Sequence, residues 1–276
     1  MVFKVCDGQI YIGDLFILIM KKVFGNKKEV IRLKDVSKYY PMGDSIVKAL
    51  CHLEFKVFEG EFVAIMGPSG SGKSTAMNLV GSLDMPTHGT IYLDNEDISE
   101  LSESDLAQVR GKRIGFIFQS FNLIPNLTVK ENVMLPMMFQ GTSVEERSEK
   151  AEELLKLVEL GDRMDHYPGE ISGGQMQRVA IARSLANDPE VILADEPTGN
   201  LDTKTGAIVM EFLEKLNKQG KTVIMVTHDP DLAKKYADVV YSLLDGELDK
   251  VTKRSGKKFI DVTKKKKKEA KENGAK

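Results

Sequence analysis

A glycine-rich loop, placed between an apolar run and a helical pattern, constrains this chain of 276 residues more than any other feature. The apolar run 61–66 predicts a buried strand, and residues 75–80 predict the helix that follows. A strand, a loop of this pattern and a helix are typical of a site that cradles nucleotide phosphates. The loop residues are Gly67, Pro68, Ser69, Gly70, Ser71, Gly72, Lys73, Ser74 and Thr75.

The residue types of this phosphate loop fit that chemistry. Glycines let the backbone curl so that several N–H groups point at one anion, and the N-terminus of the next helix adds about half a positive charge. Lys73 supplies a point charge for the β- and γ-phosphates, and the hydroxyl of Ser74 is a ligand for Mg²⁺. The loop therefore predicts a nucleoside triphosphate bound together with Mg²⁺.

A second apolar run, 191–194, ends in two acids, Asp195 and Glu196. This is the pattern of a central parallel strand whose carboxyl end enters a site. Asp195 is expected to hold Mg²⁺ largely through its water shell, and Glu196 to polarise an attacking water. The alternative is an acidic pair at the start of a helix, which Pro197 favours, but the phosphate loop favours the functional interpretation.

A second glycine motif, 171–175, precedes another helical pattern. Ser172 is suited to cap that helix, and Gly173 and Gly174 leave the backbone N–H groups accessible to an anion. Because this motif stands about 100 residues from the phosphate loop, one interpretation is that it serves a nucleotide bound mainly by another subunit.

Residues 171–183 resemble the signature of the ABC ATPases, which usually has Leu where this chain has Ile171. Further motifs of that family occur in family order between residues 40 and 228. The resemblance implies an adenine-stacking aromatic at Tyr40, with Tyr39 as the weaker candidate. It also implies nucleotide-facing residues at Gln175 and Asp202, a glutamine at 119 that contacts Mg²⁺ and water, and a histidine at 228 that contacts the γ-phosphate.

Segments 121–125 and 197–202 are similar to the branch of lipoprotein-releasing and macrolide-exporter-like ATPases. The resemblance implies an ATP-hydrolysing subunit that forms a head-to-tail homodimer with ATP and powers a separate membrane permease. The resemblance also implies that this subunit is cytoplasmic and binds peripherally to the cytoplasmic face of the cell membrane. The alternative is a soluble ABC ATPase, for example in iron–sulfur assembly. A metabolic kinase with the same loop does not explain residues 171–175.

The alternation of expected strands and helices predicts an α/β fold with a parallel sheet. The resemblance implies the same P-loop NTPase layout, with an ABC ATPase domain over 30–250. Within it we expect an antiparallel β part from 30–60 and 89–94 and a helical subdomain over about 122–176. Residues 1–29 are expected to be an extension, and 251–276 a basic, disordered tail.

Composition limits the partners. Residues 250–276 carry a surplus of nine positive charges, so the net charge of −2 leaves −11 on the rest, and no nucleic-acid partner is expected. The tail is either solvated or attracted to anionic lipid or RNA. The apolar run 10–20 contains Asp14 and is too short to span a bilayer. It is interpreted as an accessory strand or helix, as the result of a mis-assigned start codon, or as a membrane-surface contact. Two cysteines exclude a disulfide framework and indicate a reducing location.

Overall fold

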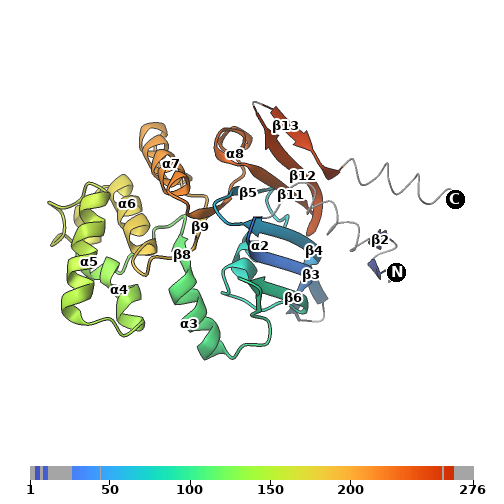
Figure 1. Cartoon of the computed structure of the whole chain (residues 1–276), viewed down its shortest axis with the longest axis horizontal. Coiled ribbons are helices and arrows are strands. Elements are labelled where there is room, and N and C mark those ends of the chain that lie inside the picture. The colour runs from blue at the N-terminus through green and yellow to red at the C-terminus, as the bar shows by residue number, and fades with distance from the viewer. Residues whose placement is uncertain (1–3, 7–8, 12–26, 44, 257, 264–276) are drawn as a thin grey trace. The chain divides into compact units, whose positions relative to one another are not determined.

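The structure is a computed structural model that describes residues 4–6, 9–11, 27–43, 45–256 and 258–263 (Figure 1). The described residues fall into two compact units. The first unit is built from the described residues within 1–100 and 228–276, and the second from residues 101–227. No helix among the described residues combines the length and the apolar character that a membrane crossing requires.

The first unit contains an antiparallel sheet in the order β4-β3-β6-β7. Side chains on the inner face are almost fully buried, as at Ile31 and Leu33, whereas Arg32 between them is partly exposed. This period of two is that of a strand with one buried face, and the antiparallel pairing of β3 with β4 and β6 confirms the predicted antiparallel β part. The strands are β3 (Glu29–Met42), β4 (Ser45–Phe58), β6 (His88–Leu93) and β7 (Glu96–Asp97).

A second group of strands in this unit carries the phosphate loop. Strand β5 (Phe62–Met66) pairs in parallel with β11 (Val239–Leu244), which pairs with β12 (Glu247–Ser255) in the antiparallel sense. β5 is buried on both faces because Val63, Ala64 and Ile65 are at most 1% exposed, as expected of a central parallel strand. Among the residues that the structure describes, this unit also contains the helices α2 (Lys73–Val80) and α8 (Pro230–Tyr236).

The structure corrects the predicted start of the tail. β12 runs across the expected boundary at residue 250 and pairs with β13 (Lys258–Asp261). Its Arg254 donates hydrogen bonds to the carbonyls of Lys234, Lys235 and Ala237 at the end of α8. Lys253 and Arg254, both within the expected tail, therefore belong to a strand, and Arg254 satisfies the helix end. The lysine run 264–268 lies outside the described residues.

Most of the expected extension also lies outside the described residues. Within it, β1 (Lys4–Cys6) and β2 (Gln9–Tyr11) form a small antiparallel pair. β3 begins at Glu29, next to the expected start of the domain at residue 30. The remaining boundaries of extension and tail stay predictions.

The second unit contains three parallel strands in the order β10-β9-β8, which confirms a parallel arrangement. β9 is the central strand, and its first four residues are fully buried. The strands are β8 (Ile114–Ile117), β9 (Val191–Asp195) and β10 (Thr222–Val226).

Helices make up the rest of the second unit. α4, α5 and α6 pack against one another, as Figure 1 shows, and the stretch expected to be helical, 122–176, contains α4, α5, one 3₁₀ turn and the start of α6. Ser143 and Thr128 begin α5 and α4 with complete capping boxes. The helices are α3 (Glu103–Arg113), α4 (Val129–Phe139), α5 (Val144–Leu157), α6 (Gly173–Ser184) and α7 (Thr203–Lys218), and the 3₁₀ turn η1 is Pro168–Glu170.

Candidate nucleotide site

The phosphate loop connects β5 to α2 in the first unit, as the sequence predicts. Gly70 and Gly72 have φ angles of +78° and +93°, which L side chains rarely adopt. At Gly72 a Cβ would also lie 2.6 Å from the carbonyl oxygen of Ala49, so the loop has no room for a side chain there. The tip of the loop, 68–70, is exposed, so its backbone is accessible to a ligand.

Two predicted site residues, Lys73 and Ser74, lie at the start of α2. Lys73 is 8% exposed, and its Nζ donates to the carbonyl oxygen of Pro68 at 2.7 Å, which holds the ammonium beside the loop. Ser74 is exposed, so its hydroxyl is accessible. The Oγ of Ser71 is buried and has no hydrogen-bond partner among the described residues.

Tyr40 lies on β3 and is anchored by residues that the sequence analysis missed. Its hydroxyl donates to Asp84 Oδ2 at 2.7 Å, and Lys38 Nζ donates to Asp84 Oδ1 at 2.6 Å. Lys38 also lies 4.9 Å from the centre of the Tyr40 ring. Burial, followed by the hydrogen bond to Asp84, raises the pKa of Tyr40. Because Asp84 is 44 residues from Tyr40, no local pattern could reveal the pair.

The acidic strand end lies in the second unit. Asp195 ends β9 and pairs with Val226 of β10 in register, so the two strand ends are level. Glu196 follows in the left-handed region with φ of +41°. Its N–H donates to the carbonyl of Val226 at 3.0 Å, and its carbonyl accepts from Gly199 N–H at 2.9 Å. A residue held in this uncommon conformation is typical of functional sites.

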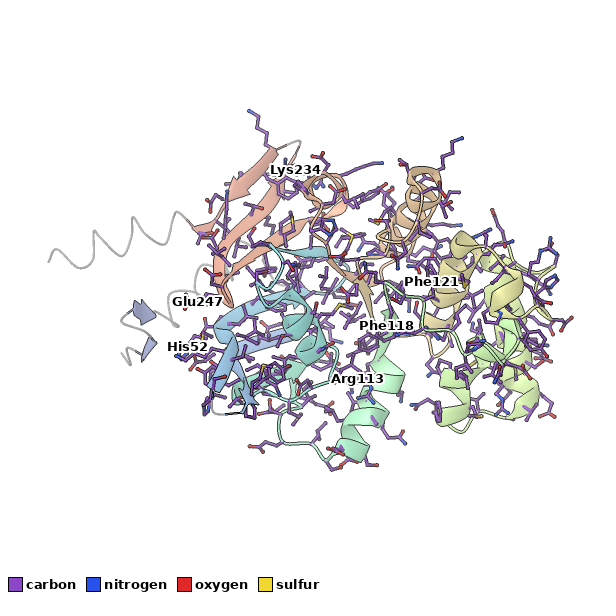
Figure 2. The ribbon with its side chains drawn as sticks, turned by 180° about the vertical axis from the view of Figure 1, so that it is seen from behind. His52, Arg113, Phe118, Phe121, Lys234 and Glu247 are labelled. Carbon is purple, nitrogen blue, oxygen red and sulfur yellow. The ribbon has the colours of Figure 1, made fainter. Side chains whose placement is uncertain are left out.

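Gln119 and Glu196 are brought together around Gly199. A Cβ at Gly199 would lie 3.0 Å from Gln119 Nε2 and 3.5 Å from Glu196 Oε2, so both side chains adjoin the same glycine. Asn200 adds a hydrogen bond of 2.9 Å from its Nδ2 to the carbonyl of Gln119. Gln119 is exposed and belongs to the segment after β8. Figure 2 labels Phe118 and Phe121 of the same segment.

The segment after Gln119 is tied to α6, which we name the signature helix because its first turn carries the motif 171–175. Phe121 and Asn122 have positive φ angles, and both of their carbonyls accept hydrogen bonds from the guanidinium of Arg183 on this helix. Burial lowers the pKa of Arg183. Sequence reasoning missed Arg183, because its partners stand about 60 residues away.

The first turn of the signature helix is built as predicted. Ser172 is its N-cap and is exposed, and its Oγ accepts from Gln175 N–H at 3.3 Å. In return, Gln175 Oε1 accepts from Ser172 N–H at 2.8 Å, so the pair is a capping box. Gly174 adjoins α7, since a Cβ there would lie 2.3 Å from Thr205 Cγ2. Asp202 caps α7 and accepts from Thr205 Oγ1 at 2.6 Å.

His228 belongs to the first unit and is exposed. It directly precedes Asp229, whose side chain caps α8 by accepting from the N–H groups of Asp231 and Leu232. The structure thus divides the expected site residues between two units. The phosphate loop, Tyr40 and His228 lie in the first, and the remaining residues lie in the second.

The comparisons with known proteins decide the family. The sequence profile described as "ABC transporter" matches residues 50–199. A protein of Thermotoga maritima named "Uncharacterized ABC transporter ATP-binding protein" is 52% identical over 227 residues, which are 82% of this chain and 97% of that protein. The chain belongs to the ABC transporter family. It is an ABC ATPase of the ATP-binding subunit type, as the motifs predict.

Two further relatives add detail. The solved cassette MJ0796, described as a dimer in a post-hydrolysis state bound to ADP and Pi, has a TM-score of 0.76 and 50% identity, and the match covers 82% of this chain and 99% of that one. "Macrolide export ATP-binding/permease protein MacB" of Brucella melitensis is 50% identical over 226 residues, which are 82% of this ABC ATPase and 35% of MacB. The predicted resemblance to macrolide-exporter-like ATPases is confirmed, and the soluble alternative gains no support.

Proposed function

We propose that two copies of this ABC ATPase close head to tail around ATP, and that hydrolysis reopens them to drive a separate permease. The observation that carries the proposal is the first turn of the signature helix. Its capping box is satisfied from within, yet Ser172 remains exposed at a helix N-terminus that attracts anions. The similar MJ0796 cassette has been solved as a dimer bound to ADP and Pi, which supports a nucleotide-bound dimer here.

In this proposal the first unit of one copy binds most of the nucleotide. The backbone N–H groups of the phosphate loop and Lys73 bind the β- and γ-phosphates. The ring of Tyr40 stacks on adenine, and its anchor at Asp84 fixes the ring in place. Ser172, Gly173 and Gly174 of the other copy close over the γ-phosphate, with Gln175 and Asp202 holding the two helix starts beside it.

The donor set suits Mg²⁺, which prefers oxygen ligands and keeps several waters. An exposed hydroxyl at Ser74, a carboxylate at the end of β9 and the side-chain amide of Gln119 are such ligands. A bound Mg²⁺ would neutralise charge on the phosphates and remove the repulsion between the adjacent acids Asp195 and Glu196. The described residues hold no group of three or more His, Cys, Asp or Glu side chains suited to a metal, so the site depends on the phosphates as well.

Glu196 is the base that polarises the attacking water, and His228 holds the γ-phosphate in line. Gln119 adjoins Glu196 at Gly199 and orients the same water. Loss of the γ-phosphate removes the contacts that favour the closed dimer, so the two copies separate.

The permease partner would contact the segment from Phe118 to Pro125 and the neighbouring helical subdomain. Apolar side chains are exposed in this part of the second unit: Ile124 is 44% exposed and Phe139 at the end of α4 is 72% exposed. A permease segment that packed here would bury these side chains, and burial of apolar surface favours association. MacB is named as an ATP-binding/permease protein, so its name combines the two functions. This supports a permease partner for this chain, which would bind it on the cytoplasmic face of the membrane.

The test of the catalytic assignment is Glu196→Gln, with Glu211→Gln on the exposed face of α7 as the matched control. We expect Glu196→Gln to bind a fluorescent ATP analogue with unchanged affinity and to lose at least about a hundredfold in turnover. Glu211→Gln should turn over at the wild-type rate. Wild-type turnover in Glu196→Gln would remove Glu196 from this role.

A further inference from the structure

A buried amide on the signature helix holds the carbonyl that follows the proposed base. Gln177 lies in the second turn of α6 and is 1% exposed. Its Nε2 donates to the carbonyl oxygen of Pro197 at 2.9 Å. Pro197 is itself buried and directly follows Glu196. A single side chain therefore connects the helix that carries the ABC signature to the turn that carries the base.

The hydrogen bond to Pro197 fixes the orientation of the Gln177 amide, and this orientation is unfavourable for its oxygen. A carbonyl only accepts, so Gln177 must present its NH₂ group to Pro197. Its Oε1 then points elsewhere, and this atom is buried without a hydrogen-bond partner in the part of the chain that the structure describes. An unpaired buried acceptor is unfavourable, so stability alone does not explain a glutamine at this position.

The turn that Gln177 holds is one that needs support. Glu196 has a φ of +41°, and such a conformation persists only where the surroundings fix it. Two main-chain hydrogen bonds fix Glu196 itself, one to Val226 and one from Gly199. The Gln177 amide fixes the next peptide group, and it is a side-chain contact from a different element.

We propose that Gln177 is a positioning residue that aligns the Glu196–Pro197 turn with the signature helix. Ser172 and Gln177 stand five residues apart on one helix, about 7.5 Å along its axis. A triphosphate of the partner copy at the helix N-terminus and the base of this copy are thus connected through one rigid element. The inference rests on the proposed role of Glu196, and it names the residue through which closure of one site aligns the base of the other.

The first test is Gln177→Met, which keeps the length of the side chain and removes the donor. We expect kcat to fall by about tenfold to a hundredfold, because small displacements of a catalytic group are costly. The KM for ATP and the binding of a fluorescent ATP analogue should not change. The Tm should move by no more than about 4 °C, because the variant leaves the Pro197 carbonyl unpaired but removes the unpaired Gln177 oxygen, so the number of unpaired acceptors stays the same.

Ser184→Ala is the matched control on the same helix. Its hydroxyl is buried and donates to the carbonyl of Ile181 at 2.7 Å, within the helix itself. This variant removes a buried hydrogen bond without touching the Glu196–Pro197 turn, so its kcat should equal that of the wild type.

The second test is Gln177→Glu, which separates positioning from packing. A carboxylate cannot donate to Pro197, whereas a protonated carboxyl can, and burial favours the protonated form. The kcat of Gln177→Glu, divided by that of the wild type at the same pH, should therefore rise as the pH falls from 8.5 to about 6. The same ratio for Gln177→Met should stay level.

Each result has one meaning. Wild-type turnover in Gln177→Met, beside a dead Glu196→Gln, would overturn the positioning role and leave the proposed function intact. A fall in kcat that follows Tm in both Gln177→Met and Ser184→Ala, with a pH-independent ratio for Gln177→Glu, would also overturn it. Wild-type turnover in Glu196→Gln would remove the proposed base, and the inference with it. The expected pattern supports it: kcat is lost in Gln177→Met, KM is unchanged, Tm moves by no more than about 4 °C, and Gln177→Glu recovers activity at low pH.

Discussion

Gly174 in the signature motif gives a prediction whose magnitude follows from the structure. A Cβ at this position would lie 2.3 Å from Thr205 Cγ2, whereas the Thr205 Cβ and Oγ1 atoms would both be 3.5 Å away. Carbon atoms in contact prefer about 3.5–4.0 Å, so the methyl group of Thr205 alone is about 1.2 Å too close. Rotating the side chain would break its hydrogen bond of 2.6 Å to Asp202.

The predicted change is therefore a coupling between two positions. Overpacking costs about 1–3 kcal/mol, and replacing a helical glycine by alanine returns up to about 1 kcal/mol. Gly174→Ala alone should lower the free energy of unfolding by up to about 2 kcal/mol. Thr205→Ser deletes the clashing methyl and keeps the hydroxyl, so in that background the same change should be neutral or stabilising by up to about 1 kcal/mol.

Urea unfolding of the four proteins in this cycle measures the coupling, with equal m-values as the check on comparability. Gly173→Ala is the matched control, because its Cβ would meet only Phe121 Cζ at 3.8 Å, an ordinary contact. A coupling energy near zero would refute the reasoning, because it would mean that the Thr205 methyl does not exclude a side chain at Gly174.

Two further predictions concern the first unit. Tyr40→Ala should weaken ATP binding about tenfold by loss of stacking, whereas the affinity of Tyr40→Phe for ATP should stay within about threefold of the wild type. Fluorescence titration measures both affinities, and equal losses in the two variants would show that the hydroxyl binds and the ring does not. Burial raises the pKa of Glu61 to about 7, so the folded state holds more protons than the unfolded state between about pH 4.5 and 7, and stability falls as pH rises through that window. Glu61→Gln can still accept from Phe58 N–H and should be more stable than the wild type above pH 7 by about 3 kcal/mol, with the difference vanishing near pH 4. A difference independent of pH in chemical denaturation would contradict this.

Local patterns in the sequence predict the parts of the site that are local in the structure. The phosphate loop stands between β5 and α2 because its glycines permit the positive φ angles that the turn requires. Ser172 and Gln175 stand three residues apart, the spacing of a capping box, and they form one. The acids at 195 and 196 end a buried strand, as the apolar run before them indicates.

Contacts between distant residues could not be predicted in this way. The anchor of Tyr40 at Asp84, the contact of Gly174 with Thr205 and the bond from Gln177 to Pro197 all join elements whose approach depends on tertiary packing. The β12 strand was missed for a different reason. Its many charged residues conceal a strand pattern in which only Val251 is buried, because β-propensity depends on context.

The central claim is that the phosphate loop of one copy and the signature turn of the other copy bind the same triphosphate. The mass of the protein in solution tests this claim most directly. Light scattering on Glu196→Gln with saturating Mg-ATP should give twice the chain mass of 30.7 kDa. Adding Ser172→Arg should return the mass to that of one chain while the affinity for ATP stays the same. A double variant that still dimerises with ATP, or a Glu196→Gln variant that stays monomeric at saturating ATP, would contradict the account.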